Sequence, residues 1–433
     1  MLTETTPVAR QRWPQQKLSH LIMHRADSLS GRANGQGSPL PSGQQPSPAS
    51  ARIAAVQSLD DYIPRPGLCV PIVTILDSRG RVLEDQQRAV VRYALQDGIG
   101  ADIIFAAGTT GEWDRIDKAR SQAVARIAIE ECRRARGSCP KKIEAWAGIT
   151  AHTRSDTLDN LKAALQAGAD AVVVAPLSIK DVEHPVEFVE RDVGAAFDRA
   201  GRMLPLFLYD NADIAAPGKS PHLHTRDVKA MSRLPYVRGI KVTAGKTVIG
   251  NYTRAASHFK AGHEFAIYAG NAYLIFDLFA PPDSVGDRMR HYWNRYLTQR
   301  TRPYGVVAGG ANAMPREWQR AWQVCRAGDV ELMRLYSGAM DEFRDACTFK
   351  RGAKAYRPAI ASLKAALKEL GVIDSDAVGA GTPAMSDGER REFSARFAGL
   401  RERIAETLER GWVSEYDPRA GQARADKSVG RNG

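Results

Sequence analysis

The sequence predicts an α/β fold, a (β/α)8 TIM barrel with a C-terminal helical appendage. Short apolar runs rich in Val, Ile, Leu and Ala recur at intervals of roughly 27 to 40 residues, which fits a strand plus a crossover helix. Because each run is almost continuously apolar, we expect both faces of its strand to be buried, as in a parallel sheet. Eight such units predict a closed barrel, and an open doubly wound sheet is the structural alternative. The runs span 68–76, 101–107, 143–148, 169–175, 204–209, 237–243, 264–270 and 304–309.

Amphipathic segments between these runs predict helices. Several of them finish in Gly or Asn, which is typical of helix ends. A longer stretch at 283–302 predicts an added helix before the eighth strand, and four more helices follow the barrel. Their apolar faces are expected to pack on the barrel or on a neighbouring subunit. The predicted helices span 83–95, 120–135, 157–168, 227–234, 317–328, 330–347, 358–370 and 387–410.

Composition divides the chain into four parts. Residues 1–57 are rich in Gly, Pro, Ser and Gln and lack periodic apolar positions, which predicts a disordered tail or a start codon assigned too early. The barrel is expected over 58–315 and the helical region over 316–412. Residues 413–433 are interpreted as a basic flexible tail.

Bulk composition excludes several classes of protein. With 433 residues, 43% hydrophobic and 25% charged, the chain can build a large core, and no uncharged apolar run is long enough to span a membrane. The five cysteines form no CxxC pair, which argues against a disulfide framework or a zinc ribbon and favours a reducing cytoplasm. About half of the net charge of +12 lies in the tails, so nucleic-acid binding is not expected.

Lys241 is the residue that most suggests chemistry. It lies within VRGIKVT, an apolar β-branched run that is expected to be a buried strand. Burial favours the uncharged amine, and only the uncharged amine can attack a ketone to form a Schiff base. The alternative is a lysine that snorkels from the strand end or pairs with a neighbouring acid.

Two further features lie at predicted strand ends, where the active site of such a barrel is found. AAGTTGE, after the second run, supplies glycines, backbone N–H groups and the hydroxyls of Thr109 and Thr110, which could bind a carboxylate. Tyr209 closes the fifth run and could relay a proton. The alternatives are a tight turn with a capping threonine and a core tyrosine with a satisfied hydroxyl.

Together these motifs resemble the dihydrodipicolinate synthase and N-acetylneuraminate lyase family of pyruvate-dependent class I aldolases. The resemblance rests on GTTGE at 108–112, Tyr209, GIK at 239–241, AGN at 269–271 and GVVAGGAN at 305–312, and covers roughly residues 67–371. It implies a (β/α)8 barrel with C-terminal helices. It also implies a homo-oligomer, a dimer or more commonly a tetramer, without metal or organic cofactor.

The resemblance also implies roles for individual residues. Lys241 would form the Schiff base with C2 of pyruvate or another 2-oxo acid, and Tyr209 would shuttle protons. Thr109 and Thr110 would hold the carboxylate. The Val307 carbonyl and the backbone at Gly270 would complete the 2-oxo-acid pocket.

The chain departs from the family pattern around the second substrate. The usual Tyr-Asn-x-Pro motif is replaced by residues 209–212, Tyr-Asp-Asn-Ala, and an arginine that the synthases use to grip their aldehyde partner is replaced near Ile214. Leu177 and Ser178 stand where the synthases carry a tyrosine pair, and the bulky Trp113 follows GTTGE. These departures weigh against a true dihydrodipicolinate synthase.

Three hypotheses follow. The first is a Schiff-base aldolase or lyase acting on pyruvate or a 2-oxo acid. The second is a dehydratase of a 2-keto-3-deoxy sugar acid with the same imine chemistry. The third is a barrel that has lost turnover and binds a metabolite.

Overall fold

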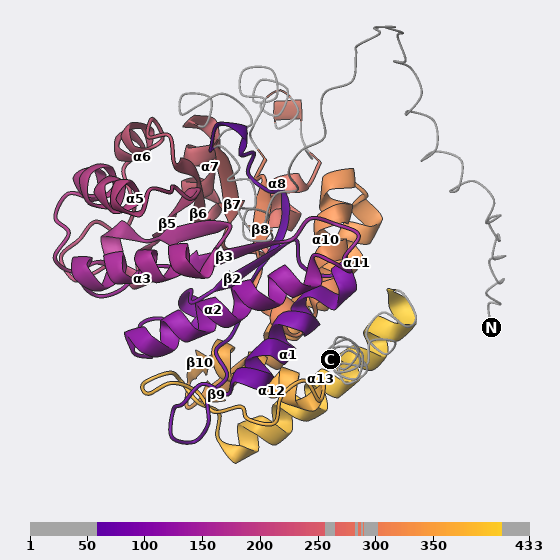
Figure 1. Ribbon diagram of the computed structural model, residues 1–433. Coiled ribbons are helices and arrows are strands. Elements are labelled where there is room, and N and C mark those ends of the chain that lie inside the picture. Colours follow the sequence, from indigo (N-terminus) through magenta and orange to yellow (C-terminus); the bar gives the residue numbers. More distant parts are fainter. Residues whose placement is uncertain (1–58, 256–264, 282–284, 287–288, 290–301, 409–433) are drawn as a thin grey trace, which may run out of the picture. The chain divides into compact units, whose positions relative to one another are not determined.

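Eight parallel strands close into a barrel in the computed structural model of the chain (Figure 1). Neighbouring strands pair in sequence order, and β1 closes the ring on β8 with Leu68 opposite Val306. The structure describes residues 59–255, 265–281, 285–286, 289 and 302–408. The predicted (β/α)8 barrel is thus confirmed and the open sheet is excluded. The strands are β1 Gly67–Pro71, β2 Ile103–Ala106, β3 Glu144–Gly148, β4 Ala171–Val174, β5 Leu206–Asn211, β6 Val237–Thr243, β7 Ala266–Ala269 and β8 Gly305–Val307.

Helices follow the strands on the outside of the barrel. Helices α1, α2 and α3 pack side by side there (Figure 1). The predicted segments match the observed helices to within a few residues, but α5, α7, α8 and the short α4 were not predicted. The helices of the barrel are α1 Glu84–Leu95, α2 Lys118–Ala135, α3 Arg154–Ala167, α4 Pro185–Glu187, α5 Gly194–Ala200, α6 Thr225–Met231, α7 Lys246–Ala255 and α8 Leu274–Phe279.

Local sequence explains where these helices begin and end. The Asp117 side chain caps α2 by accepting from Arg120 N, and the Thr153 side chain caps α3 by accepting from Asp156 N. Both satisfy backbone donors that have no partner in the first helical turn. Helix α3 ends at Gly168, whose φ of 79° lies in the left-handed region that glycine adopts without strain.

The strands separate two hydrophobic clusters, because successive side chains of a strand point to opposite faces. On β5, Phe207 and Tyr209 belong to the cluster inside the barrel, whereas Leu206 and Leu208 belong to the cluster between strands and helices. Residues of β5 with odd numbers therefore face the barrel interior.

Four long helices follow the barrel, as the sequence predicts. Helix α10 packs on β1 and α11, and α13 packs on both α11 and α12. Ser386 and Glu389 form a capping box at the start of α13. A short hairpin between α11 and α12 was not predicted. These elements are α10 Pro315–Ala327, α11 Val330–Ala346, β9 Phe349–Arg351, β10 Lys354–Tyr356, α12 Ala359–Glu369 and α13 Asp387–Thr407.

Several predictions fall on parts of the chain that the structure does not describe. The tail at 1–57 and the tail at 413–433 lie outside the described residues, as does most of the helix expected at 283–302. Within the described residues, no helix combines the length and the apolar character needed to cross a bilayer.

Candidate active site

Lys241 lies on β6 with its side chain inside the ring of strands. The residue is 5% exposed, and in the strand register it is opposite Tyr209 of β5 and Tyr268 of β7. Its Nζ atom is 3.8 Å from the ring centre of Tyr209 and 5.0 Å from the ring centre of Phe105. The amine therefore faces aromatic rings inside the barrel. A lysine that snorkels to solvent does not fit this burial.

The hydroxyl of Tyr209 lies at the centre of a group of polar side chains. It is 3.3 Å from Thr109 Oγ1, 3.1 Å from Asn211 Nδ2 and 3.4 Å from Thr243 Oγ1. Burial acts to raise the pKa of this phenol, but the positive charge of Lys241 and the hydrogen bonds that Tyr209 makes with Thr109 and Thr243 outweigh it and hold the pKa below its ordinary value. The phenol is therefore prepared to give up its proton.

The GTTGE turn follows β2 and brings Thr109 and Thr110 to the same end of the barrel. Thr109–Gly111 form a single 3-10 turn, flanked by Ala107 and Glu112 with φ of 55° and 61°. Such left-handed conformations are uncommon for residues other than glycine, so the surrounding structure must hold this turn in place. Thr110 faces the end of β8, because a Cβ on Gly309 would lie 3.7 Å from its Oγ1 atom.

Gly270 and Val307 lie at the ends of β7 and β8. Gly270 N donates to Val242 O at 2.7 Å, and a Cβ on Gly270 would lie only 2.1 Å from Thr243 Oγ1. Glycine is therefore required for Thr243 to occupy its place beside the Tyr209 hydroxyl. Val307 is 2% exposed and shares the inner cluster with Tyr209.

The turn after β5 is held without the proline of the family pattern. Asp210 points away from the barrel interior and accepts from Leu223 N at 2.8 Å, and its other oxygen is 2.9 Å from His222 Nδ1. Burial raises the pKa of Asp210 in spite of these two partners. The Asn211 side chain caps the turn by accepting from Asp213 N at 3.1 Å. Two side chains thus fix the loop that proline would otherwise restrict.

The other residues that depart from the family pattern occupy apolar or packed positions. Ile214 is half-buried and packs against the inner cluster that contains Tyr209. Leu177 packs against the outer cluster, and Ser178 is buried. The ring centre of Trp113 lies 5.3 Å from that of His152, so this indole packs against a residue of the loop after β3.

Two polar residues of this group, Asn211 and Thr243, were not selected from the sequence as site residues. Strand alternation gives a signal that could have found them. Tyr209 and Lys241 point inward, so the residues two positions further along β5 and β6 must point inward as well. Asn211 and Thr243 are those residues, and they are opposite each other in the strand register.

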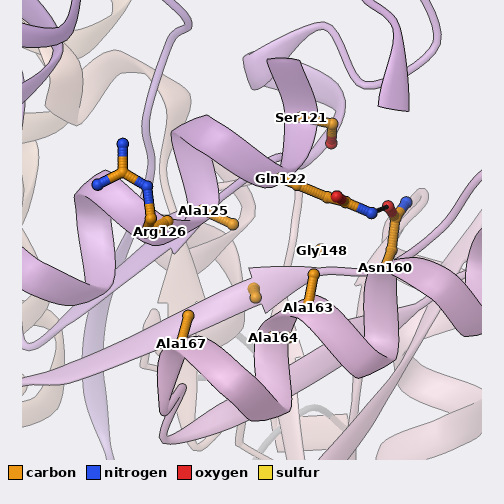
Figure 2. A pocket seen from close by; sticks show the side chains of 10 residues that line it. Ser121, Gln122, Ala125, Arg126, Gly148, Asn160, Ala163, Ala164 and Ala167 are labelled. Atoms are coloured by element: carbon orange, nitrogen blue, oxygen red, sulfur yellow. Dashed lines mark hydrogen bonds between the residues drawn. The ribbon is translucent and has the colours of Figure 1, made fainter. Parts of the chain in front are cut away.

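A pocket found elsewhere on the barrel is not part of this group. Figure 2 shows it between α2 and α3, where Gln122 Nε2 donates to Asn160 Oδ1 at 3.0 Å above a row of small side chains. Ala147 and Gly148 of β3 line it together with residues of α2 and α3, and neither Lys241 nor Tyr209 is among the lining residues. The described residues contain no group of three or more His, Cys, Asp or Glu side chains placed to hold a metal ion.

The fold and the site together define a class of protein, a (β/α)8 barrel with a buried lysine beside a tyrosine and a threonine at the strand ends. The chain belongs to the dihydrodipicolinate synthetase family, whose model matches residues 65–281. The GVVAGGAN motif at 305–312 lies beyond that match. The matched range includes Lys241, Tyr209, Thr109, Thr110 and Gly270.

Individual relatives are distant. A 4-hydroxy-tetrahydrodipicolinate synthase of Syntrophotalea carbinolica is 26% identical over 217 residues, 49% of this chain and 66% of that protein. The chain thus spans just under two thirds of that synthase. A putative mitochondrial 4-hydroxy-2-oxoglutarate aldolase of Coccidioides immitis is 26% identical over 316 residues, 70% of this chain and 86% of that protein.

Solved structures of the family share the fold. A prophage protein of Escherichia coli K12, described as a dihydrodipicolinic acid synthase family member in complex with pyruvate, superposes with a TM-score of 0.60. It is 19% identical, and the superposition covers 78% of this chain and 98% of that one. At this identity the likeness concerns the fold alone.

Proposed function

We propose that the protein is a Schiff-base-forming lyase of the class I aldolase type that acts on pyruvate or another small 2-oxo acid. The observation that carries the proposal is the position of Lys241, whose Nζ lies 3.8 Å from the ring centre of Tyr209 inside the barrel. The Tyr209 hydroxyl in turn is 3.3 Å from Thr109 Oγ1. An amine, a proton carrier and a carboxylate-binding turn are the three parts that this chemistry needs.

In the proposed mechanism, Lys241 first passes its proton to the ionised Tyr209 and then attacks C2 of the 2-oxo acid as the free amine. The carbinolamine that results loses water to give an imine, and Tyr209 transfers the protons that this dehydration requires. Thr109 and Thr110 hold the carboxylate by neutral hydrogen bonds, and the backbone at Gly270 and Val307 closes the pocket.

The protonated imine then serves as an electron sink. When the bond between C3 and C4 breaks, its electron pair moves into the imine and gives an enamine, while the C4 hydroxyl passes its proton to the ionised Tyr209 and the second product leaves as an aldehyde. Protonation of the enamine at C3 and addition of water release pyruvate and restore the lysine. Condensation is the same sequence in reverse.

Ile214 indicates that the second substrate differs from that of a true dihydrodipicolinate synthase. In the synthases an arginine near this position grips a carboxylate, whereas the half-buried Ile214 offers only an apolar surface against the inner cluster. An isoleucine cannot compensate a carboxylate charge, so a partner aldehyde with a carboxylate at this point is disfavoured. The relative named as a 4-hydroxy-2-oxoglutarate aldolase supports cleavage or condensation as the reaction type.

The imine is tested by trapping it. We expect pyruvate and borohydride together to attach a stable adduct to Lys241, located by peptide mass, and we expect Lys241→Ala to abolish the adduct. Lys180→Ala and Lys246→Ala are matched controls, because both lysines are exposed, and both variants should be labelled like the wild-type protein. An adduct that survives in Lys241→Ala would overturn the assignment.

A panel of sugar acids and of aldehydes offered with pyruvate separates the remaining alternatives. Pyruvate release identifies an aldolase, whereas loss of water from a 2-keto-3-deoxy sugar acid without pyruvate release identifies the dehydratase. The absence of an adduct with each of several 2-oxo acids would favour a metabolite-binding barrel without turnover.

We propose a cytoplasmic homo-oligomer, a dimer or a tetramer, that uses no metal or organic cofactor. Light scattering of the purified full chain gives the oligomeric state, and activity after treatment with a chelator tests the metal requirement.

A further inference from the structure

Asn211 is a polar side chain beside the proposed reaction centre that the family motif does not specify, because it occupies the variable third position of Tyr-Asn-x-Pro. It is 8% exposed, and its Nδ2 atom is 3.1 Å from the Tyr209 hydroxyl. It stands at the end of β5, opposite Thr243 of β6. The side chain therefore contacts the proposed proton carrier itself.

The orientation of the Asn211 amide follows from its second partner. Asp213 N lies 3.1 Å from Oδ1, and a backbone N–H can only donate, so the atom that it meets must be the carbonyl oxygen. The group that faces Tyr209 is then the NH2 group, which can only donate. Consequently the Tyr209 oxygen accepts a hydrogen bond from Asn211 and cannot direct its own proton there.

We propose that Asn211 is a positioning residue for Tyr209: its amide holds the phenol oxygen as an acceptor and so directs the phenol proton toward Thr109 and the substrate. The proposal rests on the function proposed above and adds a residue to it. The charged group whose field acts on Tyr209 is Lys241 of β6, and the other groups at the hydroxyl are the neutral Thr109 and Thr243.

Asn211 also favours the ionised form of Tyr209. A phenolate can accept from Asn211, Thr109 and Thr243 at once, whereas the neutral phenol directs its proton toward Thr109 and then accepts only from Asn211 and Thr243. Asn211 therefore acts in the same direction as the groups that already hold the pKa of Tyr209 below its ordinary value.

Replacement of Asn211 by aspartate separates this role from a structural one. Asn211→Asp keeps the shape of the side chain and the acceptor for Asp213 N, and changes only the group that faces Tyr209. A carboxylate there accepts the phenol proton and repels a phenolate. Asn211→Leu removes the donor without adding charge, so the phenolate loses one charge-assisted hydrogen bond, and Asp213 N loses its acceptor as well.

The readout is the ultraviolet absorbance of tyrosinate, measured during pH titration of the free full-length protein. The transition that disappears in Tyr209→Phe belongs to Tyr209. The described tyrosines with displaced pKa values otherwise titrate above their ordinary range, which separates them from Tyr209; they are Tyr62, Tyr236, Tyr252, Tyr268 and Tyr273.

We expect the Tyr209 transition to move up by about one pH unit in Asn211→Leu and by more in Asn211→Asp. A matched control is Asn160→Ala, which removes a buried asparagine that contacts Gln122 and the Ile149 carbonyl, and which should leave the transition in place. The proposal is wrong if Asn211→Asp titrates like the wild-type protein, or if Tyr209→Phe removes no transition. Because no substrate is present, this result is independent of whether pyruvate forms an imine.

Discussion

Tyr209 combines two functions in one side chain, since its ring and its hydroxyl contact different partners. The ring lies 3.8 Å from Lys241 Nζ and forms one wall of the space around the amine. The hydroxyl lies 3.3 Å from Thr109 Oγ1 at the GTTGE turn, the proposed carboxylate site. A substitution that removes only the hydroxyl should therefore separate proton transfer from the packing of the amine.

Tyr209→Phe is such a substitution. We expect kcat for the 2-oxo acid reaction to fall by about 10² to 10⁴, the usual contribution of a positioned acid or base. Imine trapping on Lys241 should become slower but persist, because the aromatic wall remains. Tyr236→Phe removes a buried hydroxyl that donates to Val189 O far from Lys241, and should leave kcat unchanged. Unchanged kcat in Tyr209→Phe would remove this residue from the mechanism.

Helix α10 shows how one buried charge can make the stability of an element depend on pH. Glu317 lies in its first turn, is 2% exposed, and its Oε1 has no hydrogen-bond partner within the described part of the chain. Burial raises the pKa of Glu317 to about 7, although Arg316 and Arg401 act in the opposite direction. The folded protein therefore takes up a proton at this site that the unfolded chain releases near pH 4.5.

This pKa shift predicts a stability change with a definite sign. Because the folded pKa is raised, the stability from protonated Glu317 is fully present below about pH 4.5 and is lost as the pH rises through about 7. Glu317→Gln should therefore raise the free energy of unfolding by about 3 kcal/mol at pH 8 and by less than about 1 kcal/mol at pH 5. Chemical denaturation at both pH values measures this change in the free energy of unfolding. An equal change at pH 5 and pH 8 would contradict the ionisation of a buried Glu317.

A buried ion pair connects the GTTGE turn of the barrel to the C-terminal helices. Lys364 Nζ of α12 lies 2.5 Å from Glu112 Oε2, and both side chains are fully buried. The second oxygen of Glu112 accepts from Gly379 N at 2.6 Å and from Thr382 Oγ1 at 2.7 Å. Segments more than 250 residues apart in the sequence thus hold the strained turn that carries Thr109 and Thr110.

Loss of one partner of this pair should destabilise the whole barrel. Lys364→Met leaves a carboxylate buried without its cation, which typically costs about 3 to 5 kcal/mol. The double variant Glu112→Gln, Lys364→Met removes both charges, and we expect it to cost less than the sum of the single variants. Thermal and chemical unfolding of the four proteins measure this coupling. Additive effects would show that the pair acts as two independent residues.

Much of the fold follows from local patterns. The run at 237–243 predicts a buried strand because β-branched residues are frequent in it, and the structure has β6 at those residues. The run at 68–76 predicts a longer strand than the observed β1, which ends at Pro71. Composition could not locate that end, because residues 72–76 remain buried after the strand has left the sheet.

Some residues of the candidate site could likewise be predicted from local sequence, and others could not. Lys241 could be selected from its apolar neighbours, and GTTGE from its glycines and hydroxyls, because each signal lies within a few residues. Asn211 and Thr243 carry no such local signal, and Lys364 looks like an ordinary lysine of an amphipathic helix until its burial is known.

The order of strands and helices, and the residue types at the strand ends, were sufficient to predict the barrel and the lysine on its sixth strand. Side-chain pairs such as Tyr209 with Thr109, or Glu112 with Lys364, could not be predicted from those patterns. Such pairs join residues from separate elements, and their distances are fixed only when the eight strands close and every side chain takes one side of its strand or helix.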